Sequence, residues 1–359
     1  MFNSGFLLTT IFLLAGFIIA GWMFFGNSNQ SELDKAFIKQ PEPQNVQQRT
    51  LKEIGFRQTA ISDRFFDATS MHFGSDGLIY FGDMEEMVIR SFDLNANPVN
   101  RYGLGEGNGP GEFARFYNAI FSDEENNLWV YDSANSRITI IDKATKSWDI
   151  HQTEEVHYHV IPMQSGKYAA RIRQYTGMKL YDENHNPLRT FDPLVQNPEL
   201  WIIILQGSSV VHSDFSIIQS FYFTNHIARY DSDGNVLYFR KPIEPVPIKK
   251  LVPEYMVFEN GGSNYNFEDY SSFKQITTEI SLSNELLHLL ISKNLNYNIE
   301  REEYQRDWLI DVYDIETGDY RYSYETPEPV SAFAVSKSHL AGISEETGRL
   351  VIWEIVDGW

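Results

Sequence analysis

After residue 50 the chain alternates between short apolar runs and short polar turns. Most runs are about five residues long, rich in aromatic and β-branched residues and bounded by Asp, Asn or Gly, which is the pattern of β-strands. An apolar residue followed by Asp and a polar turn recurs at Phe92-Asp93, Ile141-Asp142, Tyr181-Asp182, Tyr230-Asp231 and Tyr313-Asp314. The successive spacings are 49, 40, 49 and 83 residues, and a period of about 40 to 50 residues is typical of a four-stranded propeller blade.

Two neighbouring modules support this repeat directly. Residues 77–93 align without a gap on residues 126–142, and Asp83 falls on Asp132. Each window contains two apolar runs with a polar turn between them, as expected for the second and third strands of a blade. We therefore predict that the two windows form equivalent parts of neighbouring blades.

The number of modules predicts six blades. The last module, residues 328–356, supplies only three strands, and we expect residues 50–60 to supply the fourth. An N-terminal strand that completes the C-terminal blade closes the ring and leaves no exposed sheet edge. The sequence thus predicts an all-β, six-bladed β-propeller over residues 50–359.

The turns between third and fourth strands are rich in Asp and Asn. One of them has Asp231, Asp233 and Asn235 at the alternating spacing of a calcium loop. Val236 stands where an EF-hand has Gly, however, and Pro242 stands where it has a bidentate Glu. Side chains of Asp and Asn also bond their own backbone in hairpin turns, so we predict hairpins at these positions.

A glycine-rich stretch, GEGNGPGEF at residues 105–113, lies between the first two modules. It is not a phosphate-binding loop, because Asn108, Pro110 or Glu112 occupies the place of the third Gly in each possible G-x-G-x-x-G frame. No helical pattern follows it to provide a positive helix terminus. Glycine permits positive φ and Pro110 fixes its own φ, so we predict a tight crossing from the outer edge of one blade to the axis of the next.

This crossing, followed by NLWVYDSANSRITIID at residues 127–142, resembles NHL-type repeats. It is still more similar to bacterial six-bladed β-propeller proteins with a G-x-G-P-G-E-F crossing, which are usually exported or membrane-attached. The resemblance is sharp over the second blade and fair over the first. It implies the fold and a structural role for the matching residues, and it implies little about activity. Those residues are Gly107, Gly109, Pro110, Gly111, Glu112, Phe113, Asp132, Asn135 and Arg137.

Residues 1–26 differ from the rest of the chain. Phe6 to Phe25 contains no charged residue and is long enough to cross about 30 Å of hydrocarbon as a helix. A cleaved signal peptide is the alternative, with a possible cleavage site near Ser28. It normally has a basic start and a shorter apolar core. We predict a membrane anchor or signal peptide at 1–26, followed by a flexible polar tether at 27–49.

Charge and cysteine content exclude several classes of function. The formal net charge is −20, which argues against nucleic-acid binding, because phosphates are neutralised by Lys and Arg. The chain has no cysteine, which excludes disulfides and thiolate chemistry. We expect no nucleic-acid partner and no cofactor.

The sequence contains no recognisable catalytic or metal-binding set. There is no G-x-S-x-G and no H-E-x-x-H motif, and His157 with His159 is a single pair rather than a repeated set of ligands. Some NHL-like propellers are metal-dependent lyases or lactonases with ligands around the axis. The alternative to a binding function is therefore a metal-dependent hydrolase or lyase with a site in the axial channel.

Two expanded segments indicate where a ligand would bind. They are the inserted loop at residues 247–274 and a second expansion at 294–307, and both fall on the same face of the predicted propeller. Long loops in compact domains commonly carry function, and Tyr and Phe suit partner contact, although the rings of this loop also suit packing against the propeller. The candidate binding residues are Tyr255, Phe258, Tyr265, Tyr270, Arg171 and Arg173.

These observations favour a membrane-tethered propeller that binds a protein or glycan-like ligand without catalysis. Lys35 and Lys39, which follow the apolar segment, would by themselves leave the propeller in the cytoplasm. The family resemblance instead favours an extracytoplasmic propeller, either periplasmic or at the cell surface. The protein would be secreted if the N-terminal segment is cleaved.

Overall fold

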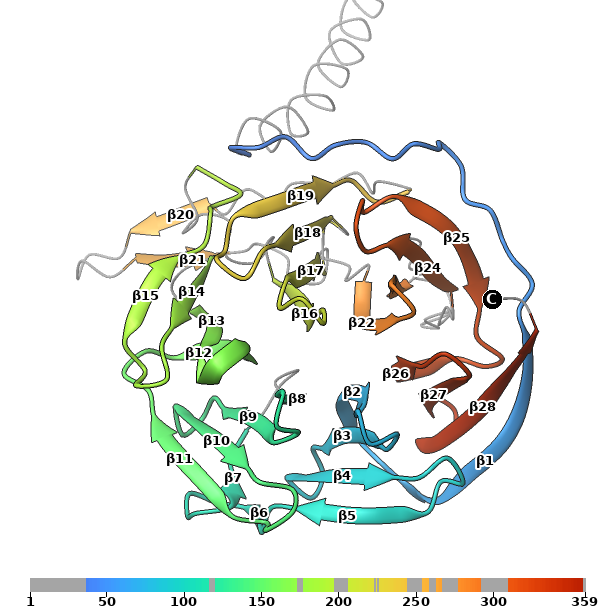
Figure 1. Cartoon of the computed structure of the whole chain (residues 1–359), viewed down its shortest axis with the longest axis horizontal. Coiled ribbons are helices and arrows are strands. Elements are labelled where there is room, and N and C mark those ends of the chain that lie inside the picture. Colours follow the sequence, from blue (N-terminus) through green and yellow to red (C-terminus); the bar gives the residue numbers. More distant parts are fainter. Residues whose placement is uncertain are drawn as a thin grey trace, which may run out of the picture.

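The chain forms six four-stranded antiparallel sheets arranged around a central axis (Figure 1). The computed structural model describes residues 37–115, 120–172, 177–196, 206–222, 224, 226–243, 254–257, 263–266, 277–291 and 309–357. Each sheet is one blade, and neighbouring strands within it pair in an antiparallel register. The all-β, six-bladed propeller predicted from the sequence is confirmed.

Blades 1 to 5 each use four consecutive strands, with the first strand nearest the axis and the fourth at the rim. Blades 1 and 2 contain β2 (Ala68–Phe73), β3 (Ile79–Asp83), β4 (Val88–Phe92) and β5 (Pro98–Tyr102), then β8 (Ile120–Ser122), β9 (Leu128–Asp132), β10 (Arg137–Ile141) and β11 (Trp148–Gln152). Blades 3 and 4 contain β12 (His157–Pro162), β13 (Tyr168–Ile172), β14 (Met178–Tyr181) and β15 (Pro187–Thr190), then β16 (Gly207–Val211), β17 (Ile217–Phe221), β18 (Ile227–Tyr230) and β19 (Val236–Arg240). Blade 5 contains β22 (Thr277–Ser283), β23 (Leu286–Ile291), β24 (Leu309–Asp314) and β25 (Tyr320–Glu325).

Blade 6 combines both ends of the described chain. It contains β26 (Val330–Val335), β27 (His339–Ser344) and β28 (Arg349–Asp357), with β1 (Gly55–Phe65) as its outermost strand. The closing strand thus begins five residues later than the predicted 50–60. The reason is that residues 50–52 pair with the outer strand of blade 5 instead, through backbone hydrogen bonds between Thr50, Lys52 and Ser323.

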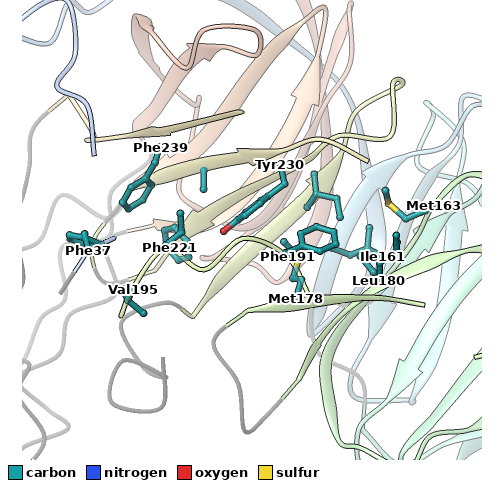
Figure 2. Close-up of a cluster of buried hydrophobic side chains, with 14 residues drawn as sticks. Phe37, Ile161, Met163, Met178, Leu180, Phe191, Val195, Phe221, Tyr230 and Phe239 are labelled. Atoms are coloured by element: carbon teal, nitrogen blue, oxygen red, sulfur yellow. The ribbon is translucent and has the colours of Figure 1, made fainter. Parts of the chain in front are cut away.

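The hydrophobic core is divided among the blade interfaces. Six clusters of buried side chains occur among the described residues, one between each pair of neighbouring blades. Figure 2 shows the cluster between blades 3 and 4, where Phe191 and Tyr230 lie between the two sheets. Middle strands such as β3, β9 and β17 are buried along their whole length because sheets cover both of their faces.

Residues 37–54, which we call the belt, run along the outer edges of blades 4 and 5 toward blade 6 (Figure 1). Phe37 pairs with Val195, and its side chain is 4% exposed in the cluster between blades 3 and 4 (Figure 2). Glu42 then exchanges backbone hydrogen bonds with the end of β19, accepting one from Lys241 and donating one to Phe239, both at 2.8 Å.

Side chains fasten the belt as well. The Gln44 amide donates to the carbonyl oxygens of Lys241 (2.7 Å) and Gly318 (3.1 Å) and accepts from the Tyr320 backbone N–H (2.7 Å). The predicted flexible tether at 27–49 is therefore wrong over 37–49. A polar, Gln- and Pro-containing composition does not exclude packing when the partner is the hydrogen-bonding edge of an outer strand.

The predicted anchor at residues 1–26 lies outside the described residues. No helix in the described part of the chain is long and apolar enough to cross a membrane.

The propeller has two faces with different connections. Connections from first to second and from third to fourth strands emerge on one face, and the described ones are two to six residues long. We call this the short-turn face. The other connections emerge on the opposite face because strand direction alternates, and they include the long segments between Arg240 and Thr277 and between Ile291 and Leu309. We call this the expanded face.

Candidate functional site

A cavity of about 330 Å³ lies in the axial channel. Its walls come from the first strands of four blades, β2, β8, β16 and β22, and from the turns that follow β2 and β8. First strands run toward the short-turn face, and the lining residues in the turns that follow β2 and β8 lie at that end of the channel. The cavity therefore reaches the short-turn end of the channel, away from the long connections.

Glu279 is the ionisable group that distinguishes this cavity. It lies on β22 next to a β-bulge, where the pairing shifts between Thr277 and Glu279, and bulges often redirect a side chain toward a functional site. Burial raises the pKa of Glu279 to about 8, opposed only by a hydrogen bond from the Ile280 backbone. At neutral pH this carboxyl group is therefore largely protonated.

His72 and several serines line the same cavity. The His72 Nε2 atom is 3.2 Å from the Ser122 hydroxyl, which links blades 1 and 2 across the wall. Burial lowers the pKa of His72 to about 4, so its imidazole is neutral near pH 7. The Ser281 hydroxyl accepts a hydrogen bond from the Val335 backbone (3.0 Å), and Ser208 meets the Tyr222 hydroxyl (3.0 Å). Polar groups in this wall are thus mostly fixed by the blades.

The glycine-rich crossing forms a compact loop rather than a straight path to the axis. Its two short strands, β6 (Gly105–Glu106) and β7 (Glu112–Phe113), pair in parallel, so the chain doubles back on itself. The Glu112 carboxylate accepts a hydrogen bond from the Gly109 backbone at 2.8 Å. Phe113 is fully buried between blades 1 and 2. Gly107 and Pro110 lie in the turn between β6 and β7.

The other matched residues join this loop to blade 2. The Asn135 amide donates to the Gly107 carbonyl oxygen at 3.2 Å. The Arg137 guanidinium donates to the carbonyl oxygens of Asn108, at 2.8 Å, and Glu112. Asp132, at the end of β9, accepts hydrogen bonds from the backbone just after the loop. These contacts hold the crossing loop against blade 2.

The predicted binding residues do not form one described site. Tyr255 and Tyr265 occupy opposite positions on the hairpin of β20 (Glu254–Val257) and β21 (Ser263–Asn266), within the inserted loop. Phe258, Tyr270 and Arg173 lie outside the described residues. Arg171 is described and is only 3% exposed, with its guanidinium 3.5 Å from the Gly207 carbonyl oxygen of blade 4. Arg171 therefore belongs to a blade interface rather than to an open binding surface.

One cluster of potential metal ligands occurs among the described residues. His212, Glu285 and Glu316 meet on the short-turn face between blades 4 and 5. Both His212 ring nitrogens already face carboxylates, Asp214 and Glu285, each at 2.9 Å. Arg229 lies 2.8 Å from Glu316. These contacts describe a charge network between two blades, and a metal ion would have to displace it.

Sequence reasoning missed Glu279 and His72 as cavity residues and Arg49 as part of the fold. The available signal for Glu279 was an acidic residue in the alternating run TTEISLS, at the start of the fifth module. A charge in the strand nearest the axis is a candidate for the channel wall. Arg49 carried no comparable signal, because its partner, Asp311 of blade 5, is 262 positions away in the sequence.

Comparison with known proteins supports the fold and leaves the function open. No protein-family model matches the sequence, and no curated protein matches it at a significant level. Among solved structures, a putative exported protein from Bacteroides fragilis is 14% identical with a TM-score of 0.52, covering 88% of this chain and 99% of that one. Virginiamycin B lyase from Staphylococcus aureus is 9% identical with a TM-score of 0.51, covering 85% and 100%. The β-propeller domain of Cps50 (Swd1) from Myceliophteria thermophila is 12% identical with a TM-score of 0.51, covering 84% and 100%. These similarities extend to the propeller fold and no further, because the identities are low.

Proposed function

We propose that this chain is a membrane-tethered propeller that binds a protein or glycan-like ligand on its expanded face, without catalysis. The supporting observation is the unequal distribution of the connections. The described short-turn connections have two to six residues, whereas β19 and β22 are separated by an insertion that includes the β20–β21 hairpin. Loops that are longer than the fold requires, on one face of a rigid scaffold, are a common arrangement for binding. The resemblance of the crossing motif to NHL-like six-bladed propeller proteins is part of this proposal.

Removal of the insertion tests the proposal. The full-length chain with residues 252–273 replaced by a short turn should fold, because the described part of this segment, the β20–β21 hairpin, is not a strand of any of the six blades. It should lose partners that copurify from solubilised membranes or bind on a glycan array. The matched control changes the short-turn face, by replacing the DENHN turn at 182–186 with the DSDGN sequence of 231–235. This control should keep the interaction. Unchanged binding after deletion of 252–273 contradicts the proposal.

The second candidate function is a metal-dependent hydrolase or lyase acting in the axial channel. The observation in its favour is that Glu279, His72 and Asp123 line one cavity. The Asp123 carboxylate already accepts hydrogen bonds from the Asn127 backbone and the Trp129 indole, which leaves fewer free groups than the three protein ligands of a typical catalytic zinc site. Metal analysis of the purified full-length chain separates the two functions, since a stoichiometric bound metal ion would favour the enzyme.

For location, we propose an N-terminal anchor with the propeller on the extracytoplasmic side. The belt fixes Phe37 between blades 3 and 4, so only residues 27–36 connect it to the predicted anchor. Ten residues span at most about 35 Å. This edge of the propeller would therefore lie close to the membrane. Protease accessibility in intact cells tests the side, and the mass of the mature chain tests whether the segment is cleaved.

A further inference from the structure

The axial cavity has a chemical character that the expanded-face proposal does not use. Its wall combines apolar side chains, such as Met71 and Ile280, with serine hydroxyls and one carboxyl group, Glu279. No Lys or Arg is among the described residues that line it. Its volume of about 330 Å³ is at the small end of the range for ligand pockets. The cavity is thus suited to a small ligand that is partly apolar and not anionic.

The Glu279 carboxyl group has no positively charged partner among the described residues. Two other titratable groups line the cavity, His72 from β2 and Asp123 from the end of β8. The Asp123 carboxylate already accepts hydrogen bonds from the Asn127 backbone (2.8 Å) and the Trp129 indole (2.8 Å). The residues of β16 that line the cavity include no titratable side chain. Strand β26, which is the first strand of blade 6 and lies next to β22, has none either.

On the strand that pairs with β22, the titratable residue is His288. It is opposite Ser281 in the register, and its Nδ1 atom is 3.2 Å from the Tyr324 hydroxyl. A buried carboxylate without a counter-ion is costly in free energy, and a cation placed beside it removes part of that cost.

We propose that the axial cavity binds a small organic ammonium ion, with the Glu279 carboxylate as its counter-ion. The ammonium group would bond to the carboxylate and to nearby serine hydroxyls, and a short hydrocarbon body would contact the apolar wall. A calcium ion fits less well, because it takes six to eight oxygen ligands and the cavity has one free carboxyl group among its described residues. An anion would meet a carboxyl group and, among the described lining residues, no cationic side chain.

Binding should depend on pH in a defined way. The competent form is ionised Glu279, and its pKa near 8 makes that form about 1% of the protein at pH 6 and about 90% at pH 9. His72 stays neutral across this range, because its pKa is about 4. Apparent affinity for an alkylammonium ion should therefore increase about 90-fold from pH 6 to pH 9.

The experiment is calorimetric titration of the purified full-length chain with n-butylammonium chloride at pH 6, 7 and 9. At pH 7, runs in two buffers of different ionisation enthalpy should show release of about 0.9 proton per ligand bound. Glu279→Gln should abolish both the binding and the proton release. Glu125→Gln, which removes the same charge from an exposed turn of the same face, should leave both unchanged.

The Gln variant is expected to fold. The raised pKa of Glu279 means that its contribution to stability is present at low pH and lost as pH increases through about 8. At pH 9 the variant should therefore melt at or above the wild-type temperature. Three results overturn the proposal: no binding to wild type at pH 9, equal binding by a folded Glu279→Gln variant, or displacement of butylammonium by stoichiometric Ca²⁺ or Mg²⁺.

Discussion

Blades 2 and 5 each bury an aspartate completely, and they compensate its charge in different ways. In blade 2, Asp132 accepts hydrogen bonds from the backbone of Ala114 (3.0 Å) and Arg115 (3.1 Å). Arg137, five residues later in the sequence, lies 3.4 Å away. In blade 5, both carboxylate oxygens of Asp311 accept hydrogen bonds from Arg49 of the belt, at 2.9 Å each.

The difference shows that the belt is part of the domain. The charge of Asp132 is compensated by residues that are close to it in the sequence. The polar network around Asp132 therefore comes from one continuous stretch of the chain. Asp311 depends on a residue 262 positions away, outside the ring of blades. Its other partner is Ser323, whose hydroxyl donates at 2.6 Å from the neighbouring strand. Blade 5 therefore requires the belt in a way that blade 2 does not.

The largest effect should come from removing the belt cation. Arg49→Ala leaves the fully buried Asp311 carboxylate without its cationic partner, and breaking a buried pair in this way costs about 3–5 kcal/mol of unfolding free energy. Denaturant unfolding of the full-length chain measures this loss. Arg57→Ala is the control, because the Arg57–Glu354 pair is exposed and should contribute about 1 kcal/mol or less.

The same pair provides a stricter test. Replacing both members together, Arg49→Met with Asp311→Leu, removes the unpaired charge as well as the pair and should recover much of the lost stability. If the double variant is as unstable as Arg49→Ala, the loss comes from belt packing rather than from the buried carboxylate.

Loss of the aspartate in blade 2 should cost somewhat less and act locally. Asp132→Ala removes the acceptor for two backbone N–H groups and leaves Arg137, which is 4% exposed, without its carboxylate; we expect a cost of about 2–4 kcal/mol. Hydrogen exchange should increase around residues 105–115 and in β9 and β10. Exchange after Arg49→Ala should instead increase in the belt and in β24 and β25. Identical exchange maps for the two variants would show that the contrast between blades is not real.

These two networks also show how far the sequence could predict the structure. The ring of six sheets follows from repeated spacing and local turn chemistry. A structural role for Asp132 was implied by the family resemblance, whereas its contacts with Ala114 and Arg115 beside the crossing loop were not predicted. The contact between Arg49 and Asp311 has no local signal, and the belt reads as a linker by composition. Glu279 had a weak signal, as an acidic residue in an alternating strand, but its environment depends on four blades meeting at the axis. The strands and turns of each repeat could be predicted from the sequence, whereas contacts between distant segments could not.

A smaller effect is expected from a matched pair of glycines. Gly111, in the crossing loop, and Gly77, in the β2–β3 turn, have φ values of +76° and +77°. A Cβ at Gly111 would be 3.0 Å from the Trp148 ring, whereas a Cβ at Gly77 meets nothing within 4 Å. Gly77→Ala should cost about 1 kcal/mol for its backbone conformation alone. Gly111→Ala should cost more, and the difference in melting temperature isolates the contact with Trp148. Equal losses would mean that the loop shifts without cost.

The smallest effect concerns aspartates that are compensated only by their own turn. Asp231 accepts hydrogen bonds from the backbone of Asp233 (3.0 Å) and Asn235 (2.8 Å) and from the Asn235 amide (2.7 Å). Desolvation opposes ionisation of Asp231, but these hydrogen bonds outweigh it and lower its pKa.

Because the pKa of Asp231 is lowered on folding, the stability gained is present above the unfolded pKa of about 4 and is lost as pH falls through the folded value. Asp231→Asn keeps the turn geometry and removes the charge, so it should cost less than about 1 kcal/mol at pH 7, and this cost should decrease as pH falls below about 4. Melting temperatures of the two chains at pH 7 and pH 3 measure this. Asp63→Asn, an exposed position on β1, controls for net charge. An Asp231→Asn deficit that is as large at pH 3 as at pH 7 would assign the stabilisation to shape rather than to charge, and would separate these turns from the two buried aspartates.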